Sequence, residues 1–166
     1  MEEKFTRLEW LKHYSEHIEN IIDSEPFLSM VCLSVGIEFL GKLHCDDKAT
    51  SNYSGKQNFE SALTHFESLK KYSNQELYKL VRCGLAHSIS IEEGIVVTTA
   101  EESSLSSTPI KLNVKQFFKD FNNAIADAEK SAKTSDVMSN DYVSVIDGLA
   151  TGKTTTISVL INDKNE

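Results

Sequence analysis

FLSMVCLSVGIEFLGKL, residues 27–43, is the most apolar stretch of this 166-residue chain and decides its fold. Apolar side chains would occupy nearly every side of a helix formed by these residues, which is typical of a helix at the centre of a protein. Ser24, Glu25 and Pro26 come directly before it and combine a capping hydroxyl, an early acid and a first-turn proline. We therefore expect a central helix over 26–43.

Two glycines and two charged residues inside this stretch predict how it packs. Gly36 and Gly41 would weaken an isolated helix, so we expect them to let a neighbouring helix approach closely. The stretch is near the lower limit of membrane-spanning length, but Glu38 and Lys42 favour a buried core helix over a membrane span. Glu38 would be costly among apolar side chains without a partner, so we expect it to have one.

The segments on either side of the central helix have the apolar spacing of further helices. Steps of three and four residues predict a helix over 2–23 and a third helix that turns Phe59, Leu63, Phe66 and Leu69 inward. Ser73 and Glu76 have the spacing of a capping box at the start of a fourth helix, which we expect to end near residue 86.

The hydrophobic period changes after the fourth helix. Alternating and β-branched residues over 88–99, around a turn at Gly94, predict a short β-hairpin. Residues 101–109 read as a surface loop, and Asn113 should cap a fifth helix. The inward-facing residues of that helix are expected to be Phe117, Phe118, Phe121, Ile125 and Ala128.

The expected fold is therefore mainly α, an up-and-down bundle of about five helices with a short hairpin after the fourth. We expect one helical domain over residues 1–134 and a C-terminal tail over 135–166. In the tail, 142–146 and 154–161 are candidates for two short strands packed on the same domain, although 142–149 could also end a helix.

Charge and cysteine content limit the classes of function. The chain has 17 basic and 25 acidic residues, a net charge of −8, which argues against a general duplex-DNA binder but leaves room for a local basic site. Its 3 cysteines are an odd number without paired spacing and are expected to be free thiols in a reducing compartment. With no signal peptide apparent at the N-terminus, we expect a cytoplasmic protein.

Residues 77–88, LYKLVRCGLAHS, carry the candidate chemistry. The guanidinium of Arg82 can hold phosphate oxygens through a fork of donors, and the imidazole of His87 can transfer protons near neutral pH. Residues five apart lie about 140° apart around a continuous α-helix, so Arg82 and His87 share a face only if the helix ends or distorts between them. The bare spacing is weak evidence, because Arg7 and His13 lie six apart on the exposed first helix.

The surroundings of Arg82 make the pair more informative. We expect Glu38 to pair with Arg82 across the core, either as a structural ion pair or to orient Arg82 toward a cleft. Tyr78, Lys79 and Ser88 are expected to support the site. Local charge is basic over 69–88, which would suit a polyanion but would also suit a solvated helix face.

The Arg82-Cys83-Gly84-Leu85-Ala86-His87 motif after LYKLV resembles the HEPN superfamily (higher eukaryotes and prokaryotes nucleotide-binding). The stretch GIEFLG at 36–41 is similar to the second helix of bacterial HEPN-like proteins, and the resemblance covers roughly residues 15–130. It implies a helical homodimer that acts as a metal-independent endoribonuclease of a toxin–antitoxin or phage-defence type. Arg82 would bind the scissile phosphate of RNA, and His87 would act as general acid and base.

Cys83 stands where active members of that superfamily often have a polar residue after the arginine. An alternative is therefore a non-catalytic HEPN-like module that dimerises or binds RNA or a partner, such as an antitoxin or the product of a neighbouring gene. A third interpretation is a helical structural protein in which Arg82 and His87 only make internal hydrogen bonds and ion pairs within the core.

Two further motifs contain residue types found in sites for a bound group, but neither has the required spacing. GLATGKT at 148–154 has three residues between its glycines, whereas a Walker A loop needs four. HCDD at 44–47 lacks a second cluster at zinc spacing. We therefore expect no cofactor, no metal site and no membrane partner.

Overall fold

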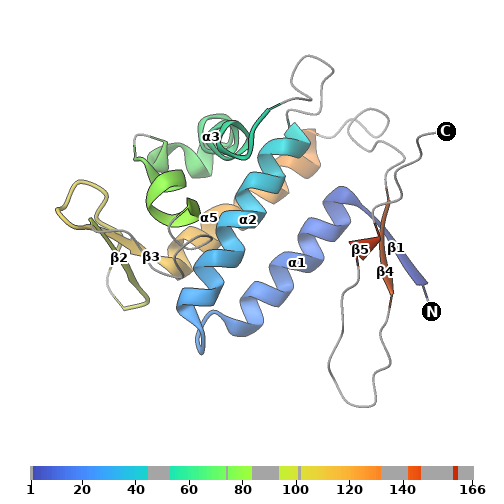
Figure 1. Cartoon of the computed structure of the whole chain (residues 1–166), viewed down its shortest axis with the longest axis horizontal. Helices are drawn as coiled ribbons and strands as arrows, with labels where there is room; N and C mark the ends of the chain where they lie inside the picture. The colour runs from blue at the N-terminus through green and yellow to red at the C-terminus, as the bar shows by residue number, and fades with distance from the viewer. Residues whose placement is uncertain are drawn as a thin grey trace.

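Helices form most of the chain that the computed structural model describes, which comprises residues 2–44, 53–73, 75–83, 94–100, 102–131, 142–146 and 159–160. The mainly helical fold with short β elements is thus confirmed (Figure 1). In chain order the elements are β1 (Glu2–Thr6), α1 (Arg7–Ile21), α2 (Pro26–His44), α3 (Gly55–His65), the 3-10 helix η1 (Glu67–Tyr72), the π-helix η2 (Tyr78–Cys83), β2 (Ile95–Thr98), β3 (Ile110–Asn113), α5 (Val114–Ser131), β4 (Tyr142–Ile146) and β5 (Val159–Leu160).

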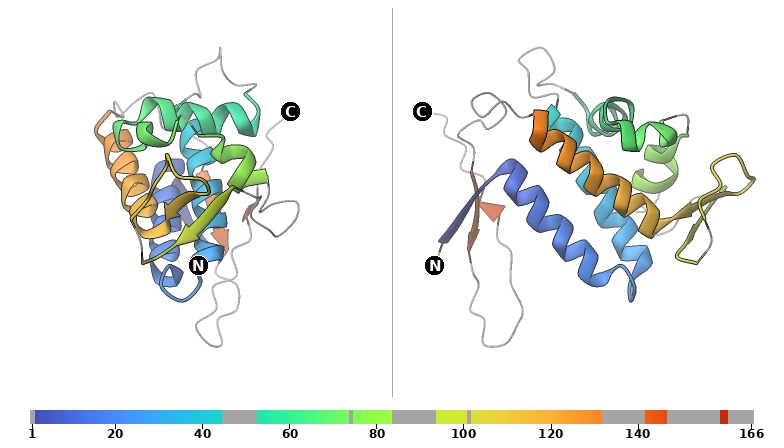
Figure 2. Two further views of the ribbon diagram at one scale, coloured as in Figure 1. Left: turned by 90° about the vertical axis from the view of Figure 1, so that its left-hand side faces the viewer. Right: turned by 180° about the vertical axis from the view of Figure 1, so that it is seen from behind.

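Helix α2 is the centre of the bundle, as its apolar sequence predicts. It packs against α1 on one side and α3 and η2 on the other, and α5 lies across its back (Figures 1 and 2). Its side chains Met30, Leu33, Ile37 and Leu40 are completely buried. Within the described residues, α2 alone has the length and apolar composition to cross a membrane, and half of that stretch is buried inside the protein.

Both glycines of α2 lie where another helix approaches, as expected. A Cβ atom on Gly41 would stand 1.8 Å from the backbone carbonyl oxygen of Asn58 in α3. A Cβ atom on Gly36 would stand 2.7 Å from Cζ of Phe121 in α5. The contact at Gly41 is with backbone, which cannot rotate away as a side chain can, so α3 can lie against α2 only where the side chain is a hydrogen atom.

The N-terminal residues form a strand, and the prediction of one helix over 2–23 is wrong at its start. Strand β1 pairs antiparallel with β4, from Glu2 opposite Ile146 to Thr6 opposite Tyr142, and β5 pairs antiparallel with β4. The strand partner of β1 comes from the far end of the chain, so helical spacing within 2–23 could not reveal it. Strands occur in both parts of the tail where they were expected, and β5 is limited to Val159–Leu160.

The second strand expected in the hairpin is present as β2, but its described partner differs. Strand β2 pairs in parallel with β3, from Ile95 opposite Ile110 to Thr98 opposite Asn113. The first strand expected, at 88–91, lies outside the described residues. Strand β3 was not predicted, because residues next to the cap of a helix give little periodic signal and the pairing depends on tertiary contact.

The third helix is shorter than predicted, and the predicted cap of the fifth helix is present. The third helix breaks at Phe66 into α3 and η1, with Phe59, Leu63, Phe66 and Leu69 all buried. The Asn113 cap is confirmed, because its Oδ1 accepts a hydrogen bond from the backbone N–H of Gln116 at 3.0 Å.

The capping box predicted at Ser73 is wrong, because Ser73 ends η1 in a helical conformation and its hydroxyl donates to the Lys70 carbonyl. A capping box forms instead at Ser54 and Gln57, at the start of α3.

Replacing Gly41 tests the close contact between α2 and α3. The Gly41→Ala variant should lose at least about 2 kcal/mol of unfolding free energy, because the methyl group forces the two backbones apart in a packed core. Urea denaturation measures this loss. Lys42→Ala, one residue away on the exposed side of α2, should change stability by less than about 0.5 kcal/mol. If Gly41→Ala and Lys42→Ala had equal unfolding free energies, the close contact between α2 and α3 at Gly41 would be contradicted.

Candidate functional site

An ion pair between α2 and η2 forms the centre of the candidate site. The Nε–H group of Arg82 donates a hydrogen bond to Oε2 of Glu38 at 3.0 Å. This is the pairing that the sequence predicts. The side chains are 27% and 26% exposed, so the pair lies at the rim of the core and is reached by water. A completely buried structural ion pair does not fit that exposure.

Arg82 belongs to a π-helical segment, whereas the sequence predicts an α-helix through residue 86. The hydrogen bonds of a π-helix run from residue i to i+5, and such segments are rare and frequently found at functional sites. The description of η2 ends at Cys83. His87 and Ser88 lie outside the described residues, so the predicted meeting of Arg82 with His87 stays a prediction.

The first turn of α3 covers the other oxygen of the Glu38 carboxylate. A Cβ atom on Gly55 would stand 2.8 Å from Oε1 of Glu38 and 3.0 Å from the hydroxyl oxygen of Tyr78. The positive end of the α3 dipole therefore lies beside a negative charge, which it stabilises. Sequence analysis missed Gly55, although it follows Ser54 in the capping box and that motif marks the start of α3.

Tyr78 shares the surroundings of the ion pair. Burial raises the pKa of its hydroxyl, and electrostatic interaction with Glu38 and Cys83 raises it further, while the positive charge of Arg82 opposes the change. The hydroxyl therefore stays protonated at neutral pH and remains a hydrogen-bond donor. The structure thus brings together Tyr78, Glu38 and Arg82, three of the residues selected from the sequence.

Tyr14 of α1 is a second tyrosine near Arg82, and the sequence analysis did not select it. Its hydroxyl donates a hydrogen bond to the carbonyl oxygen of Cys32 at 3.0 Å. Burial strongly raises the pKa of Tyr14 and Cys32 adds to the effect, whereas the charge of Arg82 lowers it. Arg82 therefore acts electrostatically on tyrosines from two helices, α1 and η2.

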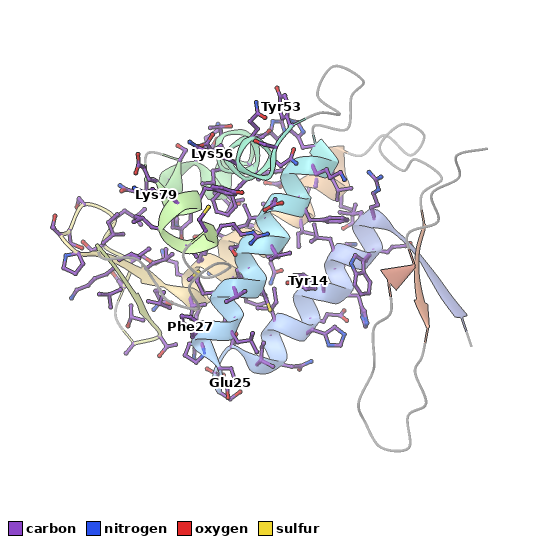
Figure 3. All side chains as sticks on the ribbon, in the orientation of Figure 1. Tyr14, Glu25, Phe27, Tyr53, Lys56 and Lys79 are labelled. Carbon is purple, nitrogen blue, oxygen red and sulfur yellow. The ribbon has the colours of Figure 1, made fainter. Side chains whose placement is uncertain are left out.

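Exposed basic and aromatic side chains come from the same side of the molecule as η2. Lys79 is exposed on η2, and Lys56 is exposed near the start of α3 (Figure 3). Tyr53, just before α3, is also exposed. The figure shows all three projecting outward around α3 and η2. Lys79, expected as a supporting residue, is thus at the surface, on the same short helix as Arg82.

The Arg82 guanidinium retains donors for a ligand. An arginine side chain carries five N–H donors, and the hydrogen bond to Glu38 uses the one on Nε. Among the described residues, none accepts a hydrogen bond from the Nη end. Because the side chain is also partly exposed, two N–H groups in a fixed fork can reach an anionic oxygen.

The pocket and the other side-chain clusters among the described residues are weaker candidates for a functional site. A pocket of 230 Å³ lies between α1 and α5, and neither Glu38 nor Arg82 lines it. In the described part of the chain, no group of three histidine, cysteine or acidic side chains is arranged to hold a metal ion. The ion pair and its neighbours are therefore the candidate site.

Removing Glu38 tests the ion pair. For a completely buried pair, Glu38→Ala would cost about 3–5 kcal/mol, and for an exposed pair at most about 1 kcal/mol. Since water reaches this pair, we expect a loss of about 1–3 kcal/mol in urea denaturation. Glu38→Gln should lose less, because its amide oxygen can still accept from Nε.

Glu67→Ala is the matched control, because Glu67 makes an exposed pair with Lys70. It should cost less than about 0.5 kcal/mol. A Glu38→Ala loss as small as that of the control would mean that the pair does not form in solution.

Comparison with protein-family models, with curated proteins and with solved structures finds no match to this chain.

Proposed function

We propose that this protein binds RNA through Arg82 and cleaves it as a metal-independent endoribonuclease of the kind found in the HEPN superfamily. One observation carries the proposal. The Arg82 guanidinium is oriented by Glu38 through Nε, its Nη end makes no hydrogen bond to a described residue, and the side chain as a whole is partly exposed. That is the arrangement of a positioned phosphate-binding arginine. A toxin–antitoxin or phage-defence role belongs to the same proposal.

The reaction needs a phosphate clamp and a group that moves protons. His87 removes the proton from a ribose 2′-hydroxyl, and the 2′-oxygen attacks the adjacent phosphorus. The bond to the 5′-oxygen breaks, and the protonated His87 gives its proton to that leaving oxygen. Arg82 neutralises the negative charge that builds up on the phosphate oxygens. The products are a 2′,3′-cyclic phosphate and a 5′-hydroxyl, and no metal is required because the substrate supplies the nucleophile.

The neighbouring surface supports an extended anionic ligand. Lys79 can neutralise a further phosphate, Lys56 can do so by exchanging its exposed ion pair with Glu60, and the exposed ring of Tyr53 can stack on a base. These contacts suit a flexible single strand, whose bases are available for stacking. The net charge of −8 is therefore compatible with RNA binding on this one side.

The outer face of α2 favours a second candidate function, a module that dimerises or binds a partner. Phe27, Leu28 and Val35 are exposed, by 37%, 47% and 39%. Leu28 and Val35 are seven residues apart and lie on one side of the helix, with the half-buried Val31 and Cys32 between them. Glu38 continues this apolar face, so a second copy seated there would place its own Arg82 close to the first. The homodimer belongs to both candidate functions.

The cleavage assay separates the two candidates. Purified protein should cut single-stranded RNA in the presence of a chelator, with 2′,3′-cyclic phosphate and 5′-hydroxyl ends. His87→Ala should lower the cleavage rate at least about 100-fold, because a general acid–base group contributes at least that factor. The circular dichroism spectrum should stay unchanged, which shows that the fold survives. Arg82→Ala should lower it as well, because the phosphate loses its clamp.

Arg7→Ala and His13→Ala are the matched controls, because this pair has similar spacing but lies on α1. Both should cleave like the unmodified protein. Absence of cleavage on varied RNAs, with binding retained and abolished by Arg82→Ala, would favour the binding module. Cleavage that survives His87→Ala would contradict the assignment of the acid–base group.

Light scattering at micromolar concentration tests the homodimer. The unmodified protein should have the mass of a dimer, and Val35→Glu should give a monomer, because it places a charge in the apolar face. Asn123→Glu, at an exposed position of α5, should leave the dimer intact. A monomeric unmodified protein would contradict an α2-mediated dimer.

A further inference from the structure

Two histidines one helical turn apart on α1 form a cluster that the proposed RNA site does not use. The Nε2 atoms of His13 and His17 are 3.1 Å apart. Their rings meet edge to face, with centroids 4.6 Å apart and planes at 77°. One neutral ring can donate its N–H to the other across this distance, so the two Nε2 atoms face each other.

That separation also fits two ligands of one metal ion. Zinc binds histidine nitrogens at about 2.0–2.1 Å, so two ligands at angles between square-planar and tetrahedral are about 2.9–3.4 Å apart. The observed 3.1 Å lies in this range. A metal ion can take the place of the shared proton once the donor ring carries its N–H on Nδ1 and both rings turn their Nε2 lone pairs toward the ion.

A neighbouring carboxylate favours the required form of His13. Nδ1 of His13 lies 3.4 Å from Oε2 of Glu16, a long contact to an exposed side chain. A proton on Nδ1 directed at this carboxylate leaves the lone pair on Nε2, which is the atom facing His17. The His13 side chain is 34% exposed, so an ion can reach the pair from solvent.

We propose that His13 and His17 form a two-histidine site for a divalent late transition-metal ion, Zn²⁺ being the expected occupant. Imidazole nitrogen selects zinc, copper and nickel over magnesium and calcium, which prefer oxygen ligands. In the described part of the chain, no third histidine, cysteine or acidic side chain joins the pair in an arrangement that would hold a metal ion. The ion closes a ring across one turn of α1 and stabilises the folded state, because it binds that state preferentially.

A second histidine pair provides an internal control. His44 at the end of α2 and His65 at the end of α3 stack with centroids 3.3 Å apart and planes at 26°. Ring nitrogens carry their lone pairs in the ring plane, so those of stacked rings do not converge on one point. Two histidine pairs of one chain thus differ in whether they can chelate.

Zinc titration followed by nuclear magnetic resonance of the histidine ring protons tests the proposal on the unmodified protein. Zn²⁺ should shift the signals of His13 and His17 together at neutral pH, and Mg²⁺ should not. Acidification should release the ion, because a protonated imidazole cannot bind it. Shifts confined to the signals of His44 and His65 would overturn the proposal.

Calorimetry on variants gives an independent measurement. His17→Ala should weaken Zn²⁺ binding at least about tenfold, and His65→Ala should leave it unchanged. Equal affinity of the unmodified protein and His17→Ala would overturn the proposal. RNA cleavage is measured with chelator present, so the outcome of either experiment is independent of the other.

Discussion

The contact between Gly41 of α2 and the backbone of Asn58 in α3 is the constraint on which the rest of the structure depends. A Cβ atom at Gly41 would stand 1.8 Å from the Asn58 carbonyl oxygen. The two helices can therefore approach this closely only because residue 41 is a glycine. Gly55 is about one turn from Asn58, and Glu38 is about one turn from Gly41. The same crossing therefore brings the start of α3 onto the Glu38 carboxylate, where a second glycine leaves room for Oε1.

The position of Glu38 explains how a charged residue is tolerated in the most apolar helix of the chain. Arg82 neutralises one carboxylate oxygen, and the first turn of α3 lies against the other. Partial exposure lowers the desolvation cost that a completely buried pair would carry. The same exposure leaves the Arg82 side chain within reach of solvent, so the feature that lowers the cost of the pair also makes Arg82 accessible to an anion.

The outer face of α2 connects the two candidate functions. Its apolar side chains remain exposed although the helix is the centre of the core, because α1, α3, η2 and α5 cover only its other sides. Glu38 and Arg82 lie at the edge of this face. A second copy seated there would exclude water from the apolar residues and bring two arginines together. The histidine pair on α1 concerns a different chemistry, metal binding, and depends on local helix geometry.

Sequence by itself determined the central helix, its proline start, the cap at Asn113 and the Glu38–Arg82 pair. Each of these follows from local spacing or from the cost of an unpaired charge among apolar residues. It also contained the four-residue spacing of His13 and His17, but only ring orientation distinguishes a pair whose nitrogens face each other from a stacked pair. Tertiary structure alone decided that Glu2–Thr6 is a strand, that β2 pairs in parallel with β3 and that η2 is a π-helix. These features depend on partners distant in the chain or on packing against α2, and periodicity within a short segment carries no information about either.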